Sequence, residues 1–209
     1  MTLRIVPQTG SSARDFAMKH HSHHEPPQGW LFAVGVEEDG RLCCVAIAGR
    51  PVNQQLDQLG HIVEITRVAS DGTKHAASMC LGAITRMALA GGYTRLISYT
   101  ILGEAGTSYR ASGWKPVHFV KGGEWSWCRS GRPRKSVTQP GDKIRWEFGP
   151  DAQPLNPEVD RLCRESVGKI DIPGRRPPTA PVLEMFAVHD GDHHDPVPET
   201  TPEFRDRDQ

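Results

Sequence analysis

The chain lacks most features that would assign it to a class at once. It has no net charge, because 25 Lys and Arg balance 25 Asp and Glu, so its average composition indicates neither a nucleic acid nor a membrane surface as partner. No stretch approaches the roughly 20 apolar residues that a transmembrane helix needs, and residues 1–7 lack the apolar core of a signal peptide. The five cysteines are odd in number and contain no C-x-x-C pair, which favours reduced thiols in a cytoplasmic protein.

Charge is distributed unevenly along the chain. Between residues 110 and 145 the basic residues far outnumber the acidic ones, and after residue 150 this balance reverses. A loop within the basic part lies between tryptophans, and its cations are Arg129, Arg132, Arg134 and Lys135. Cations can follow a phosphate backbone while neighbouring aromatic rings stack on bases, so these four residues are candidate nucleic-acid contacts. The alternative is a solvated hairpin loop whose tryptophans pack in the core.

Hydrophobic periodicity predicts a mixed α/β domain over residues 1–148. Strands are expected at 3–6, 30–37, 42–49, 61–69, 93–99, 115–119, 125–127 and 143–148, and helices at 11–20, at 75–90 and around Tyr109. Pro7 is expected to end the first strand, and 125–127 to pair with 143–148. In the extension, residues 149–209, one short helix is expected near 156–168. The rest of the extension is rich in Pro, Asp, Glu and Arg and is expected to be largely disordered.

The most informative stretch is Glu-Ala-Gly-Thr-Ser-Tyr-Arg-Ala-Ser-Gly-Trp at residues 104–114. It resembles the last conserved motif of the GNAT (Gcn5-related N-acetyltransferase) superfamily, in which Ala, Tyr, Gly and an aromatic residue follow at set intervals. The resemblance implies a mixed, mostly antiparallel central sheet flanked by helices, with an irregular C-terminal extension. It also implies transfer of an acyl group from acetyl-CoA or another acyl-CoA to an amine acceptor, with Tyr109 as the acid that protonates the leaving thiolate. Otherwise, Tyr109 is a packing residue between helix and sheet.

Residues 63–78 resemble the fourth strand of GNAT proteins and the loop after it. The resemblance implies that Glu64 is the general base, and that the backbone of Val68 and Ala69 holds the pantetheine arm. The pyrophosphate would then lie at a helix N-terminus, where free N–H groups and the helix dipole favour an anion, against Thr73, Lys74, Ala76 and Ser78. The loop departs from the family, because Thr73, Ala76 and Ser78 stand where it carries Arg or Gln, Gly, and Gly or Ala. Alternatively, this is an ordinary strand and helix, with Glu64 in an ion pair.

Four histidines occur in the segment His-His-Ser-His-His at residues 20–24. In a GNAT fold this connection would line the acceptor pocket, where His20 and His21 are candidate catalytic residues near neutral pH. His20 and His24 would share one face of a helix and are the candidate metal ligands, for iron or zinc. The alternative is a solvated helix end.

Taken together, these segments resemble GNAT-like proteins of phages and prophages and, more loosely, the Mom family of DNA-modification proteins. That family alters adenine N6 through an iron-binding His/Tyr pair, and His20 and His21 lie where the pair is expected, with the Tyr missing. A GNAT-like acyltransferase in the cytoplasm, or the host cytoplasm for a phage protein, is therefore the first expectation. A Mom-like enzyme acting on DNA and a non-enzymatic GNAT-fold binding protein are the alternatives. GNAT domains often dimerise, so a homodimer is a further expectation.

Overall fold

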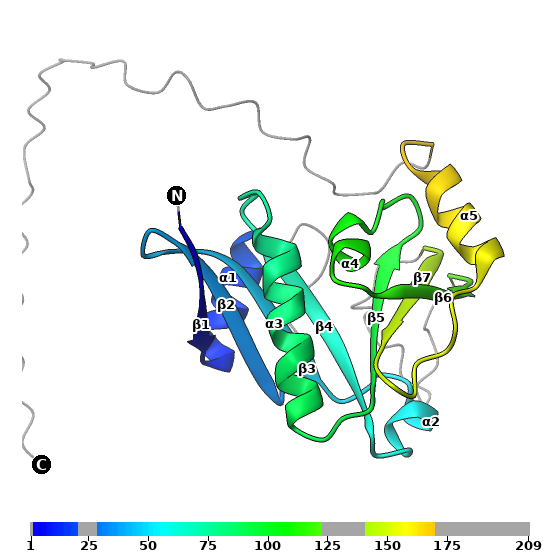
Figure 1. Ribbon diagram of the computed structural model, residues 1–209, viewed down its shortest axis with the longest axis horizontal. Coiled ribbons are helices and arrows are strands. Elements are labelled where there is room, and N and C mark those ends of the chain that lie inside the picture. Colours follow the sequence, from blue (N-terminus) through cyan, green and yellow to red (C-terminus); the bar gives the residue numbers. More distant parts are fainter. Residues whose placement is uncertain (1, 21–28, 123–140, 170–209) are drawn as a thin grey trace, which may run out of the picture. The chain divides into compact units, whose positions relative to one another are not determined.

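The computed structural model describes residues 2–20, 29–122 and 141–169, all within one compact unit, Met1–Arg175. A single seven-stranded sheet runs through this unit in the order β1-β2-β3-β4-β5-β7-β6 (Figure 1). Only the β4–β5 pair is parallel; the other five pairs are antiparallel. The strands are β1 (Leu3–Gln8), β2 (Phe32–Glu38), β3 (Arg41–Gly49), β4 (Ile62–Ser70), β5 (Arg95–Ile101), β6 (Lys115–Val120) and β7 (Lys143–Phe148).

Helices cover the β2–β4 part of the sheet on both faces. The five helices of the described residues are α1 (Gly10–His20), α2 (Gln54–Asp57), α3 (Ala76–Ala90), α4 (Thr107–Ala111) and α5 (Pro157–Ser166). In Figure 1, α3 crosses in front of the sheet and α1 lies behind it. Two buried clusters correspond to these faces: a large one under α3, and a small one that joins Ala13 and Ala17 of α1 to β2, β3 and β4. The structure therefore confirms the predicted mixed, mostly antiparallel sheet flanked by helices.

The longest helix follows the periodicity of its sequence. In α3, small and aliphatic residues recur every three or four positions and are buried, among them Cys80, Leu81 and Ile84. The helix ends at Gly91, whose N–H donates to the Met87 carbonyl at 3.0 Å. This agrees with the predicted helix at 75–90.

Two local predictions were wrong. Pro7 does not end the first strand, because β1 continues through Gln8 and pairs with β2 along its whole length; β1 is an edge strand, where a proline without an N–H is tolerated. The partner of residues 143–148 also differs from the prediction. Strand β7 inserts between β5 and β6 and pairs with both, whereas residues 125–127 lie outside the described part of the chain.

Strands β4 and β5 separate after three paired positions, and we call the opening the fork. The last pair is Glu64↔Ile97, although β4 continues to Ser70 and β5 to Ile101, and Figure 1 shows the two strands diverging beyond this point. Strand β4 carries a bulge here, since Ala48 pairs with Ile65 but Ile47 pairs with Arg67. A bulge bends its strand and increases the local twist, which fits the divergence. Beyond Glu64, the β5-facing edge of β4 therefore has no strand partner within residues 2–20, 29–122 and 141–169.

The α5 helix packs against the main core. Pro157 stands at its first position and the Asn156 side chain accepts from Glu158 N and Val159 N, so its start is well capped. Val159 and Cys163 are buried in the cluster under α3 and α4. The helix lies within the range predicted for it, while the domain boundary at residue 148 stays a prediction. No helix among the described residues is long and apolar enough to cross a membrane.

Candidate active site

A chain of two hydrogen bonds closes the inner end of the fork. The Tyr109 hydroxyl of α4 lies 2.7 Å from Ser98 Oγ of β5, and Ser98 Oγ donates to the Ile65 carbonyl of β4 at 2.8 Å. A serine hydroxyl has only one proton, and here the carbonyl takes it. Tyr109 is therefore the donor to Ser98.

Aromatic rings hold Tyr109 in place. Its ring stacks on Trp146 at 5.3 Å and meets the edge of Trp114 at 5.6 Å. Gly106, with φ +60°, comes so close to Trp146 that a Cβ atom there would lie 2.2 Å from the indole. Burial raises the pKa of Tyr109 to about 12, so the phenol is protonated at neutral pH and is available as a proton donor.

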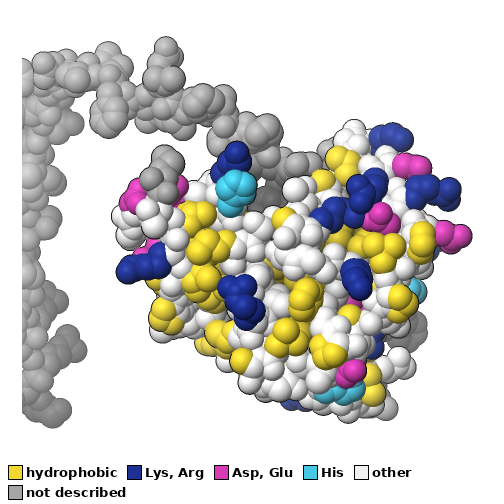
Figure 2. All heavy atoms as spheres, viewed as in Figure 1, with side chains coloured by type: hydrophobic (Ala, Val, Ile, Leu, Met, Phe, Trp, Pro, Cys, Tyr) yellow, Lys and Arg dark blue, Asp and Glu magenta, His cyan; other side chains and the backbone are white. Residues whose placement is uncertain are grey.

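The short α4 helix is also fixed from outside by α5. Arg110 forms an ion pair with Asp160 of α5, and its guanidinium lies 5.0 Å from the Trp146 ring centroid. The Gly103 N–H, in the loop before α4, donates to Ser166 Oγ at 3.2 Å. Charged side chains of both signs gather over α4 and α5 at the right of Figure 2.

Glu64 lies at the same fork on the other face of the sheet. Its neighbours Val63 and Ile65 point into the core with Tyr109, so the Glu64 side chain points away from that core. It is 7% exposed and accepts a hydrogen bond from Val52 N at 2.9 Å. Burial raises the pKa of the Glu64 carboxyl, against the opposing effects of the Val52 hydrogen bond and of the positive charges on Arg67 and Lys143. Glu64 and Tyr109 therefore lie on opposite faces of the sheet at the fork.

Basic and phenolic groups surround Glu64 on this face. Burial lowers the pKa of Lys143 while the charge of Glu64 raises it, and the same two effects act on Arg67. Burial and the charge of Glu64 both raise the pKa of Tyr99 on β5. Burial of the carboxyl raises its pKa and the neighbouring cations lower it, and the effect of burial is the larger of the two.

The predicted pyrophosphate loop uses most of its polar groups internally. Thr73 donates from both N and Oγ1 to Asp71 Oδ1, at 2.9 and 2.7 Å, and Ala76 N donates to Thr73 O at 3.2 Å. Burial would raise the pKa of Asp71, but hydrogen bonds from Arg41 and Thr73 outweigh it, so the pKa falls and the carboxylate stays charged. This negative charge lies in the loop where an anion was predicted.

Other groups at the N-terminal end of α3 are suited to bind an anion. The amides of Ala77 and Ser78 lie in the first turn of α3, where N–H groups have no acceptor within the helix itself. Lys74 is exposed next to them. The residues present thus fit a phosphate through two amides and one ammonium group rather than through a glycine loop.

The backbone N–H groups of Val68 and Ala69, the two residues predicted to hold pantetheine, point in opposite directions. Val68 pairs with Ala46 and Ala69 with Val45 in a regular part of the ladder. Because amides of neighbouring residues in a strand point to opposite edges, only one of the two amides faces the fork. The roles of Val68 and Ala69 stay predictions, as do those of Glu64 and Tyr109.

The histidine and basic segments are only partly described. His20 is the last residue of α1, and its ring stacks on Phe16 at 4.3 Å. His21 and His24 lie outside the described residues, as do Arg129, Arg132, Arg134 and Lys135. Within the described ranges, no group of three or more His, Cys, Asp and Glu is arranged to hold a metal ion.

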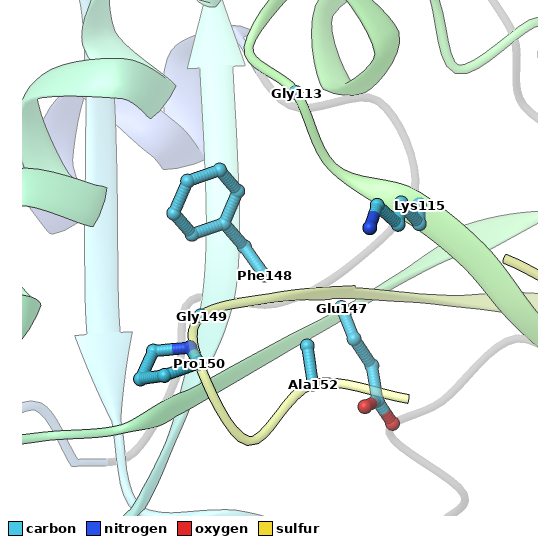
Figure 3. Close-up of a pocket in the computed structure, with 7 residues that line it drawn as sticks. All are labelled: Gly113, Lys115, Glu147, Phe148, Gly149, Pro150 and Ala152. Carbon is cyan, nitrogen blue, oxygen red and sulfur yellow. The ribbon is translucent and has the colours of Figure 1, made fainter. Parts of the chain in front are cut away.

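Ser98 was not among the site residues predicted from the sequence, although its position in β5 marked it as a buried hydroxyl. Leu96, Ser98 and Thr100 alternate on the core-facing side of β5, and a hydroxyl at such a position needs a buried partner. A surface hollow of about 430 Å³ gives no further lead to the fork. It is lined by Lys115, Phe148 and Pro150, among others (Figure 3), and Phe148 pairs with Leu96, at the end of β5 where β4 and β5 are still joined.

Comparison with known proteins gives matches at the level of structure. Neither the protein-family models nor the curated protein sequences contain a match. An N-acetyltransferase from Staphylococcus aureus Mu50 is similar over 71% of this chain and 99% of its own, with 13% identity and a TM-score of 0.51. The Salmonella typhimurium protein yncA, assigned as an acetyltransferase and solved with its cofactor acetyl-CoA, is similar over 73% and 96%, with 12% identity and a TM-score of 0.52. At these identities the likeness shows the fold, which is the one the tyrosine motif predicted.

Proposed function

We propose that this chain, which has the fold of the GNAT N-acetyltransferases, moves an acyl group from acyl-CoA to an amine acceptor at the β4–β5 fork. The observation that carries the proposal is the placement of two proton-transfer groups on opposite faces of one opening. The Tyr109 phenol, on a half-buried side chain, is protonated on the α4 face, and the Glu64 carboxyl is buried on the other face. Acyl transfer to an amine needs such a pair, since one proton leaves the amine and one is added to the departing thiolate.

Each group has the protonation behaviour that its role requires. Glu64 is the base: its raised pKa makes the carboxylate a better proton acceptor near neutral pH than an exposed glutamate. Tyr109 is the acid, because its proton is present at any physiological pH and already points along the fork to Ser98. The acyl-CoA donor supplies the activated thioester.

The open strand edge and the start of α3 would hold the donor. The β5-facing edge of β4 beyond Glu64, which has no strand partner among the described residues, would bind an extended, amide-containing arm in the manner of strand addition. The Ala77 and Ser78 amides, with Lys74, would bind the phosphates. Asp71, already paired with Arg41, opposes a negative ligand there, so we expect phosphate contacts weaker than those of a glycine loop.

The test joins binding to turnover. Acetyl-CoA is titrated into the purified protein by calorimetry, and release of the free CoA thiol is followed with a panel of acceptors: a polyamine, a peptide with a free N-terminus, and duplex DNA. DNA belongs in the panel because the sequence predicts basic contacts at residues 129–135. We expect acetyl-CoA to bind in the micromolar range, and one class of acceptor to support turnover. Absence of acetyl-CoA binding would refute the proposal.

Tyr109→Phe tests the acid directly. It removes one hydroxyl and keeps the ring that stacks on Trp146, so we expect turnover to fall at least about tenfold with acetyl-CoA affinity unchanged. The matched control is Tyr93→Phe, since Tyr93 packs against Phe32 away from the fork and its loss leaves turnover at the wild-type level. Equal turnover in the two variants would remove Tyr109 from the mechanism.

A further inference from the structure

Ser98 occupies the first step at which β4 and β5 no longer pair. The ladder ends at Glu64↔Ile97, and the next residue of each strand is Ile65 and Ser98. Here the Ser98 side chain, not the backbone, makes the cross-strand bond, donating to the Ile65 carbonyl at 2.8 Å. The side chain is 1% exposed. Ser98 therefore forms the floor of the fork.

We propose that Ser98 is a positioning residue that holds the Tyr109 proton at the floor of the fork and supports the tyrosinate that forms when the proton is given up. The inference rests on the proposed acyl transfer. The 2.7 Å bond to Ser98 Oγ fixes the direction of the Tyr109 O–H. Since the acceptor of that proton is a hydroxyl and not a carboxylate, the proton remains on the phenol and can be transferred.

The Ser98 proton can serve either of two oxygens. In the resting state it is donated to the Ile65 carbonyl. For the transfer, the Tyr109 O–H turns from Ser98 Oγ to the thiolate. As its proton leaves, rotation of the Ser98 hydroxyl brings the serine hydrogen from the Ile65 carbonyl to the phenolate oxygen. The O–H bond of Ser98 does not break in this exchange, so one proton leaves the Tyr109 oxygen and no other group is ionised.

The electrostatic surroundings make this support necessary. Burial raises the pKa of Tyr109, and the charges of Glu104 and Glu64 raise it further, whereas the hydrogen bond with Ser98 lowers it. Ser98 is thus the group that favours the ionised phenol against burial and two carboxylates. Without it the phenol would be a weaker acid, and proton transfer to the thiolate would slow.

The test measures Tyr109 ionisation apart from activity. The chain has only three tyrosines, so fluorotyrosine gives three ¹⁹F NMR signals, and the Tyr109 signal is the one that Tyr109→Phe removes. We expect Ser98→Ala to move the Tyr109 titration upward by about one pH unit. Ser98→Cys, close in size with a weaker donor, should move it by less, and it keeps the test available should the alanine variant not fold. Ser70→Ala is the control, because it removes a half-buried serine hydroxyl that accepts from the Gly72 N–H at the far end of β4, and the titration should not move.

Turnover provides the second readout. We expect Ser98→Ala to lower turnover about tenfold in the wild-type background and to have no further effect once Tyr109→Phe is present. An unmoved Tyr109 titration in both Ser98 variants would overturn the inference, and so would an equal loss of turnover in both backgrounds. If the titration moves but no variant transfers an acyl group, the Ser98–Tyr109 bond stands and the proposed function fails.

Discussion

Glu147 is the most deeply buried charge among the described residues, and its removal gives a quantitative test of the structure. Its side chain has no exposed surface. Its two carboxylate oxygens accept hydrogen bonds from the Arg95 guanidinium, at 2.6 and 2.9 Å, and one of them also accepts from the Gln153 N–H at 2.8 Å. Arg145 forms a further ion pair with Glu147 at 3.0 Å. Figure 3 shows its carboxylate on the opposite side of β7 from the ring of Phe148. The strand register puts Glu147 next to Ile97, the residue that pairs with Glu64.

Glu147→Ala should destabilise the fold far more than an average substitution. It leaves Arg95 and Arg145, each 13% exposed, with charges that have lost their partner in a poorly solvated place. Breaking a buried ion pair from one side costs about 3–5 kcal/mol, against a total stability of about 5–15 kcal/mol for an ordinary domain. Glu147→Gln keeps the shape and one acceptor oxygen, so its cost should be smaller.

Urea unfolding measures both effects against a surface control. Glu37→Ala removes an ion pair with Arg4 whose side chains are 21% and 72% exposed, and such pairs contribute only about 0–1 kcal/mol. We expect Glu147→Ala to lower the free energy of unfolding by several times as much as Glu37→Ala, at an unchanged m-value. Comparable losses in the two variants would show that the Arg95–Glu147 cluster is solvated and that β5 and β7 are not packed as described.

Two more predictions concern the fork. The folded-state pKa of Glu64 is raised above its ordinary value of 4.5, so its contribution to stability is full below pH 4.5 and is lost as pH rises through the folded pKa. The stability of Glu64→Gln relative to wild type should therefore increase with pH above 4.5 and then level off; a difference independent of pH in thermal melts would contradict the burial of Glu64. Gly106→Ala places a Cβ atom 2.2 Å from Trp146 at a backbone φ of +60°. We expect it to lower the melting temperature and to shift the Tyr109 fluorine signal. The control is Gly40→Ala, where φ is +87° but the space around the new Cβ is open, so that only a backbone strain of about 1 kcal/mol is expected. A Tyr109 signal that stays in place in Gly106→Ala would show that Trp146 does not fix α4.

Local sequence patterns predicted the elements better than their arrangement. The spacing of Cys80, Leu81 and Ile84 is a property of one segment, and it predicted α3 within a residue at its start. By contrast, the insertion of β7 between β5 and β6 depends on pairing between residues about fifty positions apart, for which a single sequence carries no signal. The prediction that Pro7 ends the first strand was wrong for the same reason. A proline is tolerated in a strand that lies at the edge of the sheet, and a single sequence does not show which strand that is.

The residues of the candidate site likewise divide into those that one short stretch of sequence predicts and those that only the fold brings together. Tyr109 was predictable because Ala105, Gly113 and Trp114 form a motif with it in one short stretch. Ser98 was not, because its two partners come from other segments and only the fold brings Ile65 and Tyr109 to it. Thr73 was predicted as a phosphate contact from its alignment, but alignment could not show that Asp71 takes both of its donors.

The position of the acid depends on more of the chain than its motif. Helix α4 has five residues, too few to be stable alone, so the location of Tyr109 must come from contacts with other elements. Trp146 and Ser98 provide two of these, and α5 provides more through Arg110–Asp160 and Gly103–Ser166. Since α5 lies in the segment that the sequence set apart as an extension, a chain cut at residue 148 would keep the complete motif and lose part of what holds the phenol at the fork. The chemistry proposed for Tyr109 is therefore a property of residues 2–169 taken together rather than of the motif alone.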